Sequence, residues 1–288
     1  MRALVKRERI DFIIVDEIHY SKQRSVAVEN ISLRRQNVTM LAALAAERNP
    51  DLHVLGMSAT PAINNLQEGK SLVELVTGVT NDDLGTRATV PNCMDLYQHL
   101  VTLGIRKMPK DDRREYYELP EEVDCQEYVD EIRDLGRAGT PLALEQILTR
   151  ARLPVIREHI EPKTLIYTHY IKGIDRLLWD ALVDDGWKVG FYTGEDKSGL
   201  NGFLEGDVDV LIGSSAIGTG VDGLQHVCNR LIVNVLPWTA AEFEQLKGRL
   251  YRRGQRRDVT MVIPLTFAEV GGERWSWCDS KMQRLRFK

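Results

Sequence analysis

Two acidic residues follow directly on a run of apolar residues near the start of the sequence. The segment reads Phe-Ile-Ile-Val-Asp-Glu-Ile-His, so Asp16 and Glu17 stand side by side and His19 comes two positions later. Acids at the carboxyl end of a buried parallel strand lie where α/β folds bind ligands. One carboxylate there can hold Mg²⁺, and its neighbour can orient or deprotonate a water molecule. The alternative is a polar strand end that runs into an ordinary loop.

Two further segments place small polar residues and glycines after apolar runs. Ser58 and Thr60 lie in Gly-Met-Ser-Ala-Thr-Pro, at the end of the second run. Gly218, Gly220 and Asp222 lie in a glycine-rich loop that follows a later run. Glycines let a backbone approach a ligand closely. Each of these segments, taken alone, is more often a turn than a binding site.

An arginine-rich segment lies near the end of the sequence, with five arginines within residues 249–257. Arg249 and Arg252 are three residues apart and would share one face of a helix. Guanidinium groups keep their charge and grip phosphate oxygens with a planar fork, so this pair suits a polyphosphate. The alternative is a solvated basic helix end, which the helix dipole favours.

The composition limits the class of protein. A chain of 288 residues with 43% hydrophobic and 28% charged residues predicts one large or two medium domains with a packed core. The net charge of −4 provides no global basic field, so any contact with nucleic acid must be local. The four cysteines are scattered, which indicates reduced thiols rather than disulfides or a zinc site. We find neither a signal peptide nor a transmembrane segment and expect an intracellular protein, cytoplasmic or nucleoid-associated, with no membrane partner.

Short apolar runs recur along the chain with helical stretches between them. The runs cover residues 11–17, 52–60, 163–169, 188–194, 208–215, 230–236 and 259–267. Continuous apolar runs suit strands that are buried on both faces, so we predict an α/β fold with parallel sheets. The stretch between the second and third runs, from about residue 80 to residue 162, is polar and turn-rich. The expected domains are a first lobe (1–78), a helical bridge (79–161), a second lobe with five parallel strands (162–268) and the start of a C-terminal extension (269–288).

The order of these segments resembles the motif series of superfamily-two helicases. Asp-Glu-x-His, Ser-Ala-Thr, Gly-Thr-Gly-Val-Asp and Gln-x-x-Gly-Arg-x-x-Arg-x-Gly-Gln follow one another in that order. Asn-Asn-Leu after Ser-Ala-Thr-Pro, and Leu-Pro-Trp before the arginines, are similar to the Swi/Snf-like branch with its DExH box. That branch usually has Gly-Leu-Asn where this chain reads Gly-Val-Asp-Gly-Leu-Gln. The resemblance covers nearly the whole chain and implies two RecA-like lobes of the P-loop-NTPase type.

The resemblance also implies a role for individual residues. Asp16 would bind the Mg²⁺ of ATP, and Glu17 would activate the attacking water. Arg249 and Arg252 would be the arginine fingers that stabilise the transition state. The residues expected to bind the nucleotide, or to link it to the second lobe, are His19, Ser58, Thr60, Gly220, Asp222 and Gln245. The residues expected to contact nucleic acid are Ser214, Gly218, Thr219, Arg256 and Arg257.

The expected function is an ATP-dependent translocase or helicase, with duplex DNA as the substrate and ATP and Mg²⁺ as cofactors. The alternative is a non-hydrolysing subunit with a degenerate helicase core that binds nucleic acid or a partner. A third hypothesis is the motor of a nuclease-linked defence system, although we see no nuclease motif in the sequence.

The phosphate-binding loop of this superfamily, Gly-x-x-x-x-Gly-Lys-Ser/Thr, normally precedes the DExH box. The fifteen residues before Asp16 contain no glycine. Residues 64–71 end in Gly-Lys-Ser, but they begin with Asn64, and we interpret them as an ordinary helix start. We therefore expect a fragment with an incomplete first lobe and weak ATP binding by itself. A separate chain or a preceding segment would supply the loop.

Overall fold

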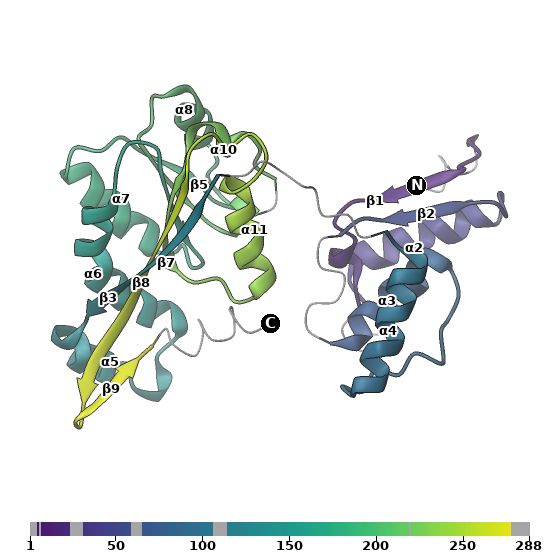
Figure 1. Cartoon of the computed structure of the whole chain (residues 1–288), viewed down its shortest axis with the longest axis horizontal. Coiled ribbons are helices and arrows are strands. Elements are labelled where there is room, and N and C mark those ends of the chain that lie inside the picture. Colours follow the sequence, from purple (N-terminus) through teal and green to yellow (C-terminus); the bar gives the residue numbers. More distant parts are fainter. Residues whose placement is uncertain are drawn as a thin grey trace. The chain divides into compact units, whose positions relative to one another are not determined.

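The computed structural model describes residues 5, 7–23, 31–58, 65–105, 114–218 and 220–277. The chain forms two compact units, residues 1–109 and 110–288 (Figure 1). Both units combine helices with parallel strands, which confirms the predicted α/β fold class. Each of the seven apolar runs contains a strand. No helix within the described ranges has the length and apolar character needed to cross a membrane.

The first unit is built on two parallel strands, β1 (Phe12–Val15) and β2 (His53–Gly56). Its helical elements are η1 (Ile18–Ser21), α2 (Leu33–Ala46), α3 (Leu66–Thr77) and α4 (Val90–Leu103). Ile18 is buried against Leu72 and Leu75 of α3, and this cluster holds the segment after β1 in place. The core of the first unit therefore reaches to the predicted acidic site.

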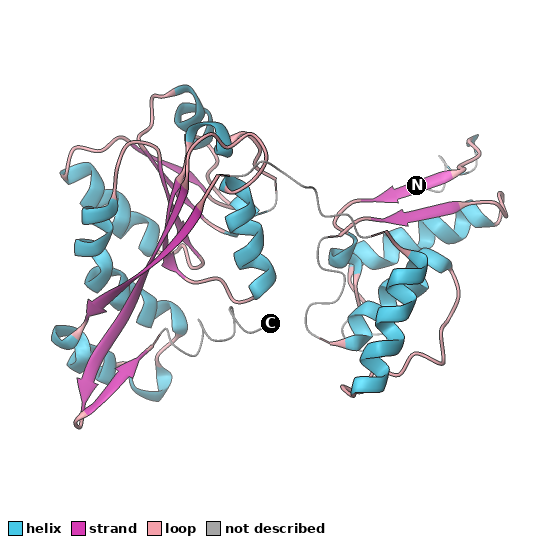
Figure 2. Cartoon of the chain, in the orientation of Figure 1, coloured by secondary structure: helices cyan, strands magenta, loops and turns pink. Residues whose placement is uncertain are grey.

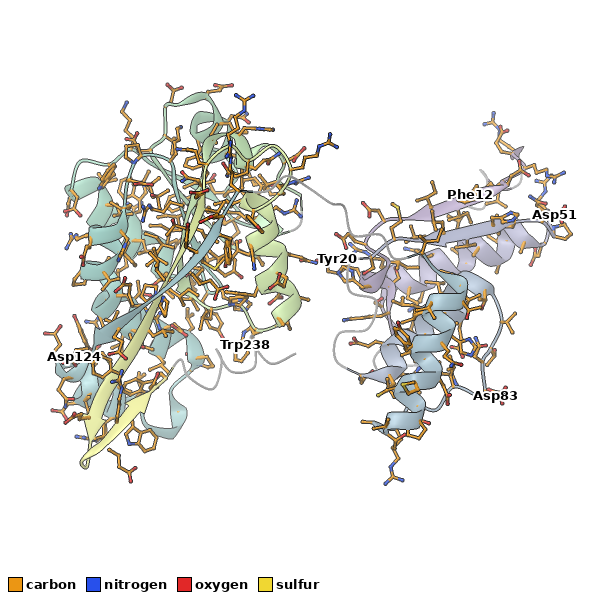
Figure 3. The ribbon with its side chains drawn as sticks, viewed as in Figure 1. Phe12, Tyr20, Asp51, Asp83, Asp124 and Trp238 are labelled. Carbon is orange, nitrogen blue, oxygen red and sulfur yellow. The ribbon has the colours of Figure 1, made fainter. Side chains whose placement is uncertain are left out.

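One face of this small sheet is exposed. Phe12, which is labelled in Figure 3, and Ile14 of β1 are 53% and 61% exposed, whereas Ile13 between them is buried. Leu55 of β2 and Met57 just after it are also exposed. Successive side chains of a strand point to opposite faces, so these residues form one apolar surface. Strand β1 carries apolar residues on both faces, but only one face is packed against other elements in the described part of the chain.

Helix α3 begins within residues 64–71, whose sequence partly resembles that of a phosphate-binding loop. The Asn65 side chain accepts a hydrogen bond from the Glu68 backbone N–H at 3.0 Å, which is an ordinary helix cap. Lys70 lies on the helix, 3.9 Å from Glu74 one turn later. The interpretation of this segment as a helix start is confirmed from Asn65 onward.

The second unit contains a sheet of seven strands within the described residues (Figure 2). Its parallel strands, in spatial order, are β3 (Tyr116–Asp124), β8 (Val259–Val270), β7 (Arg230–Val235), β4 (Thr164–Thr168), β6 (Val210–Gly213) and β5 (Val189–Tyr192). Strand β9 (Glu273–Ser276) is antiparallel to β8. The helical elements are η3 (Gln126–Tyr128), α5 (Val129–Asp134), η4 (Gly136–Ala138), α6 (Pro141–His159), α7 (Ile174–Asp184), α8 (Gly199–Glu205), α9 (Ser215–Gly218), α10 (Leu224–Val227) and α11 (Ala240–Leu250).

Helices cover both faces of this sheet, as the apolar runs predicted. In the central strand β4, Leu165 and Tyr167 pack in the cluster that includes α8 and α11. Ile166, between them, packs in the opposite cluster with α6 and α7. All five residues of β4 are buried. A strand that is buried on both faces has a nearly continuous apolar run, and in β4 this run lies between the buried Thr164 and Thr168.

The expected bridge at 79–161 differs from the observed structure. Its first part holds α4 of the first unit, and its second part holds β3, α5 and α6 of the second unit. Strand β3 pairs with β8 from Tyr116 to Asp124 and adds an edge to the sheet. Pro120 is tolerated because an edge strand leaves one row of backbone groups without a neighbouring strand. The helical character expected of the bridge is found in α4, α5 and α6.

The end of the second unit also differs from the expected C-terminal extension at 269–288. Strand β8 continues to Val270, and Gly271 and Gly272 turn the chain back into β9. Both glycines have positive φ (64° and 82°), as a two-residue hairpin turn requires. The rest of the expected extension, residues 278–288, lies outside the described residues.

Candidate functional site

The two predicted acids lie in a turn that is tied to both strands of the first unit. The backbone N–H of Met57 donates to Val15 O, and the N–H of Ile18 donates to Met57 O, each at 2.9 Å. Asp16 Oδ1 accepts the N–H of Glu17 at 2.9 Å. Glu17 itself has left-handed backbone angles (φ 48°, ψ 48°). Such angles are uncommon for a residue other than glycine and often mark functional sites.

His19 joins the DExH segment to the Ser-Ala-Thr segment. Its ring is 3% exposed, and Nδ1 lies 2.9 Å from Ser58 Oγ and 3.2 Å from Glu17 Oε2. A single ring nitrogen makes one linear hydrogen bond, so the shorter contact with Ser58 is the hydrogen bond and Glu17 is an electrostatic neighbour. The structure thus brings together three predicted site residues of the first unit. Thr60 lies outside the described residues.

The protonation of His19 is coupled to the folding of the first unit. Burial lowers the pKa of His19 below its ordinary value of 6.5, and nearby Glu17 opposes this shift. As the pH falls below 6.5, the unfolded chain therefore takes up a proton more readily than the folded chain. The free energy of unfolding is consequently expected to decrease as the pH is lowered below 6.5.

We expect His19→Gln to flatten this pH dependence. The measurement is urea unfolding of the protein and the variant at several pH values between about 7.5 and about 5.5, with the slope against pH as the readout. The amide of glutamine can still bond to Ser58 but does not titrate. Equal slopes for the two proteins would contradict the inference, whatever their absolute stabilities.

Magnesium is the metal that the helicase resemblance implies. The Asp16 side chain is exposed, directly beyond the end of β1. In the described part of the chain, no three His, Cys, Asp or Glu side chains gather as a metal site. Mg²⁺ usually keeps several waters and is bound by one or two carboxylates together with substrate phosphates. Asp16 therefore fits a Mg²⁺ that arrives with a nucleotide, and it does not fit a metal held by the protein alone.

Arg249 lies in the last turn of α11, whose start is well defined. Arg252 lies two residues beyond the end of this helix, so the two arginines do not share a helix face as predicted. Thr239 Oγ1 accepts the N–H of Glu242, and Glu242 Oε2 accepts the N–H of Thr239, at 3.2 and 3.4 Å. This reciprocal pair is a capping box and fixes the first turn of the helix. Phe243 and Leu246 are buried against the sheet, so the helix presents Arg249 to the glycine-rich loop.

Both arginines bind the glycine-rich loop that follows β6. The guanidinium of Arg249 donates to Gly218 O at 2.5 Å and to Val221 O at 2.9 Å. Arg252 Nη1 lies 3.1 Å from Asp222 Oδ1. Two segments that are about thirty residues apart in the sequence therefore form one cluster, which we call the loop–arginine cluster (residues 214–218, 220–228 and 245–257).

Five other predicted residues belong to this cluster, including the exposed Arg256 and Arg257, and one cannot be placed. Gln245 lies beside Gly218, since a Cβ on that glycine would be 3.7 Å from Gln245 Oε1. Gly220 has a φ of 156°. Ser214 is 5% exposed, and its Oγ accepts the N–H of Ala216 at the start of α9. Thr219 lies outside the described residues.

Gln255 is a residue of this cluster that the sequence analysis did not assign to a role. Its side chain is 7% exposed. Nε2 donates to Cys228 O at 2.8 Å and to Leu250 O at 3.3 Å, and Oε1 accepts the backbone N–H groups of Arg256 and Arg257 at 3.0 Å. One amide thus joins α11, the loop after α10 and the exposed arginine turn. The closing Arg-x-Gly-Gln of the motif was the available signal.

An aromatic cluster at the second unit's sheet was also missed. The ring of His169, after β4, lies 5.1 Å from Tyr170 and 6.1 Å from Trp238, after β7, with edge-to-face geometry. Trp238 is 44% exposed (Figure 3). These residues follow the carboxyl ends of neighbouring parallel strands, the edge where α/β folds bind ligands. Aromatic residues after two apolar runs were the signal in the sequence.

Residues 143–254 match the family described as the helicase conserved C-terminal domain. The match runs from α6 to the arginine segment and includes all but the end of the loop–arginine cluster. Residues 143–254 therefore resemble a helicase C-terminal domain, in agreement with the order of the motifs.

Individual proteins also resemble this chain. The uncharacterized ATP-dependent helicase YqhH of Bacillus subtilis (strain 168) is 35% identical over 104 residues, which cover 35% of this chain and 18% of that protein. The chain thus matches less than a fifth of the length of this curated relative. The Hef helicase domain of Pyrococcus furiosus is 14% identical with a TM-score of 0.45, covering 92% of this chain and 73% of that one. S. cerevisiae Dbp5 bound to RNA and ADP BeF3 is 15% identical with a TM-score of 0.46, covering 91% and 56%.

Proposed function

We propose that the protein is part of an ATP-driven motor that moves on nucleic acid, with duplex DNA as the substrate. The observation that carries the proposal is the loop–arginine cluster, in which Arg249 and Arg252 bind the glycine-rich loop of a helicase-type domain. The choice of duplex DNA rests on the resemblance to the Swi/Snf-like branch.

The residues of the first unit support ATP hydrolysis in this proposal. Asp16 would hold the Mg²⁺ of ATP, and Glu17 would orient and deprotonate the attacking water. His19 and Ser58 would transmit the state of the nucleotide, since their hydrogen bond links the two segments. The left-handed backbone of Glu17 supports a functional rather than a structural role for this turn.

The residues of the second unit would bind phosphates. Arg252 would stabilise the charge that develops on the γ-phosphate during hydrolysis. Gly220, Asp222 and Gln245 would lie near the nucleotide. Arg256 and Arg257 are exposed and would contact the nucleic acid backbone. Ser214, Gly218 and Thr219 remain predicted nucleic-acid contacts, with the backbone of the loop as the contacting group for the buried Ser214.

The test is ATP hydrolysis by the natural full-length protein with duplex DNA, single-stranded DNA, RNA or no nucleic acid. Hydrolysis is expected to rise most with duplex DNA. Glu17→Gln should lower turnover by about 10²–10⁴-fold, because general-base catalysis by the carboxylate is lost. Glu47→Gln changes an exposed acid elsewhere in the same unit and should have no effect.

Two outcomes would contradict the proposal. One is turnover by Glu17→Gln that equals the unmodified protein. The other is nucleic-acid binding without any hydrolysis, which would favour a non-hydrolysing binding subunit. Stimulation by RNA rather than duplex DNA would keep the motor and overturn the substrate.

A further inference from the structure

The Arg249 side chain brackets the centre of the glycine-rich loop. Its two terminal nitrogens donate to carbonyl groups on either side of Gly220, at Gly218 and Val221. The Val221 side chain is 2% exposed, so the loop is anchored to the core at this point. The loop also contains two glycines with positive φ, at 156° for Gly220 and 91° for Gly223. Glycine backbones lose the most conformational freedom on ordering, and an external clamp offsets that loss.

The planar guanidinium suits this task better than any other cation. It presents its N–H groups in a fixed fork, so two bonds to two carbonyls also fix the orientation of the group. Hydrogen bonds from a charged donor are stronger than neutral ones. Arg249 is half-buried, and its guanidinium group donates hydrogen bonds to two carbonyl groups of the loop. Its charge therefore stabilises the loop.

Arg252 differs from Arg249 in each of these respects. Its guanidinium is 40% exposed and meets a side-chain carboxylate, that of Asp222, which is 80% exposed. Exposed ion pairs contribute little to stability, so a phosphate can replace Asp222 with little loss. Of the two predicted fingers, Arg252 is the one that can exchange its present partner for a ligand.

We infer that the two arginines have different roles: Arg249 is a positioning residue that holds the glycine-rich loop at Gly218 and Val221, and Arg252 is the residue that meets phosphate. The role of Arg252 rests on the proposed function, whereas the role of Arg249 does not. Arg249 then acts on catalysis only through the loop that it orders.

The experiment is amide hydrogen exchange of the 288-residue chain without nucleotide, followed by mass spectrometry of peptides covering 214–228. This region includes the bonded amides of Ile217, His226 and Cys228, next to the loop. Arg249→Ala is expected to speed exchange there roughly tenfold or more, since hydrogen bonds to a charged group are lost. Arg249→Lys should give an intermediate increase, because an ammonium keeps the charge but lacks the fork.

Arg252→Ala is the matched control. It removes an arginine just beyond the end of the same helix, and it should change the rate of exchange by less than about fivefold, as for an exposed ion pair. Peptides of β4 and α7 report whether each variant is folded, and if Arg249→Ala unfolds, the comparison rests on Arg249→Lys. Unchanged exchange in both Arg249 variants, or equal increases in the Arg249 and Arg252 variants, would overturn the inference. Neither result depends on whether the protein hydrolyses ATP.

Discussion

Replacing Arg252 with alanine is expected to lower ATP turnover by about 10³-fold or more, while the binding of ATP and DNA changes little. Negative charge builds on the γ-phosphate oxygens as the bond to the leaving group breaks, and a guanidinium at that position lowers the barrier. The present partner of Arg252 is Asp222 at 3.1 Å in an exposed pair, which a phosphate can replace. The measurement is steady-state hydrolysis by the full-length protein at saturating ATP and duplex DNA.

Arg256→Ala is the control for this prediction, because it removes the same charge four residues later. The side chain is exposed and lies beyond the motif, so turnover at saturating DNA should stay near normal. Its loss should instead weaken DNA binding modestly and reduce the dependence of binding on salt, as for a phosphate-backbone contact. Normal turnover in Arg252→Ala with a large loss in Arg256→Ala would show that the arginines have been assigned in the wrong register.

The change of Gln255 to glutamate is expected to destabilise the second unit by about 3 kcal/mol. Two carbonyls, Cys228 O and Leu250 O, would lose their donor and face a carboxylate oxygen in a site that is 7% exposed. The other carboxylate oxygen could still accept the two backbone N–H groups. The midpoint of thermal unfolding should fall by roughly 6–12 °C for a unit of this size.

Gln146→Glu gives a matched comparison for this change. Gln146 makes one hydrogen bond, from Nε2 to Lys172 O, and it is not in the core. Its replacement should alter the unfolding free energy by no more than about 1 kcal/mol. Similar midpoints for the two variants would mean that the buried amide of Gln255 does not stabilise the cluster as the geometry indicates.

The buried strands could be predicted from the sequence because both of their faces are covered. In β4 each residue from Thr164 to Thr168 is buried, so the run carries its own signal. Strand β3 was not predicted because it is an edge strand with one solvent-exposed face. Its acidic residues are therefore interspersed with apolar ones, and it can contain Pro120. Strand β9 was not predicted, because its residues Glu273–Ser276 do not form an apolar run. It forms because the turn at Gly271 and Gly272 brings it alongside β8.

The candidate site was only partly readable for a similar reason. Residue type and order singled out Asp16, Glu17 and the two arginines as candidates. Arg249 donates its hydrogen bonds to the backbone oxygens of Gly218 and Val221. Every residue carries such an oxygen, so the sequence does not show which ones Arg249 will bind. The same applies to Gln255, whose four partners are all backbone groups. Such contacts are set by how the backbone is folded and become visible only with the fold.

The position of β3 in the second unit's sheet has a consequence for how the chain can bind ligands. Because Arg114 already belongs to the second unit and Ile105 to the first, eight positions (106–113) separate the described parts of the two units. A connection this short keeps each unit at an effective concentration on the order of millimolar with respect to the other. Any ligand that touches both units then binds as a bivalent ligand, with an avidity that exceeds its affinity for either unit. Each unit can therefore hold such a ligand weakly and release it quickly, as the proposed motor would require.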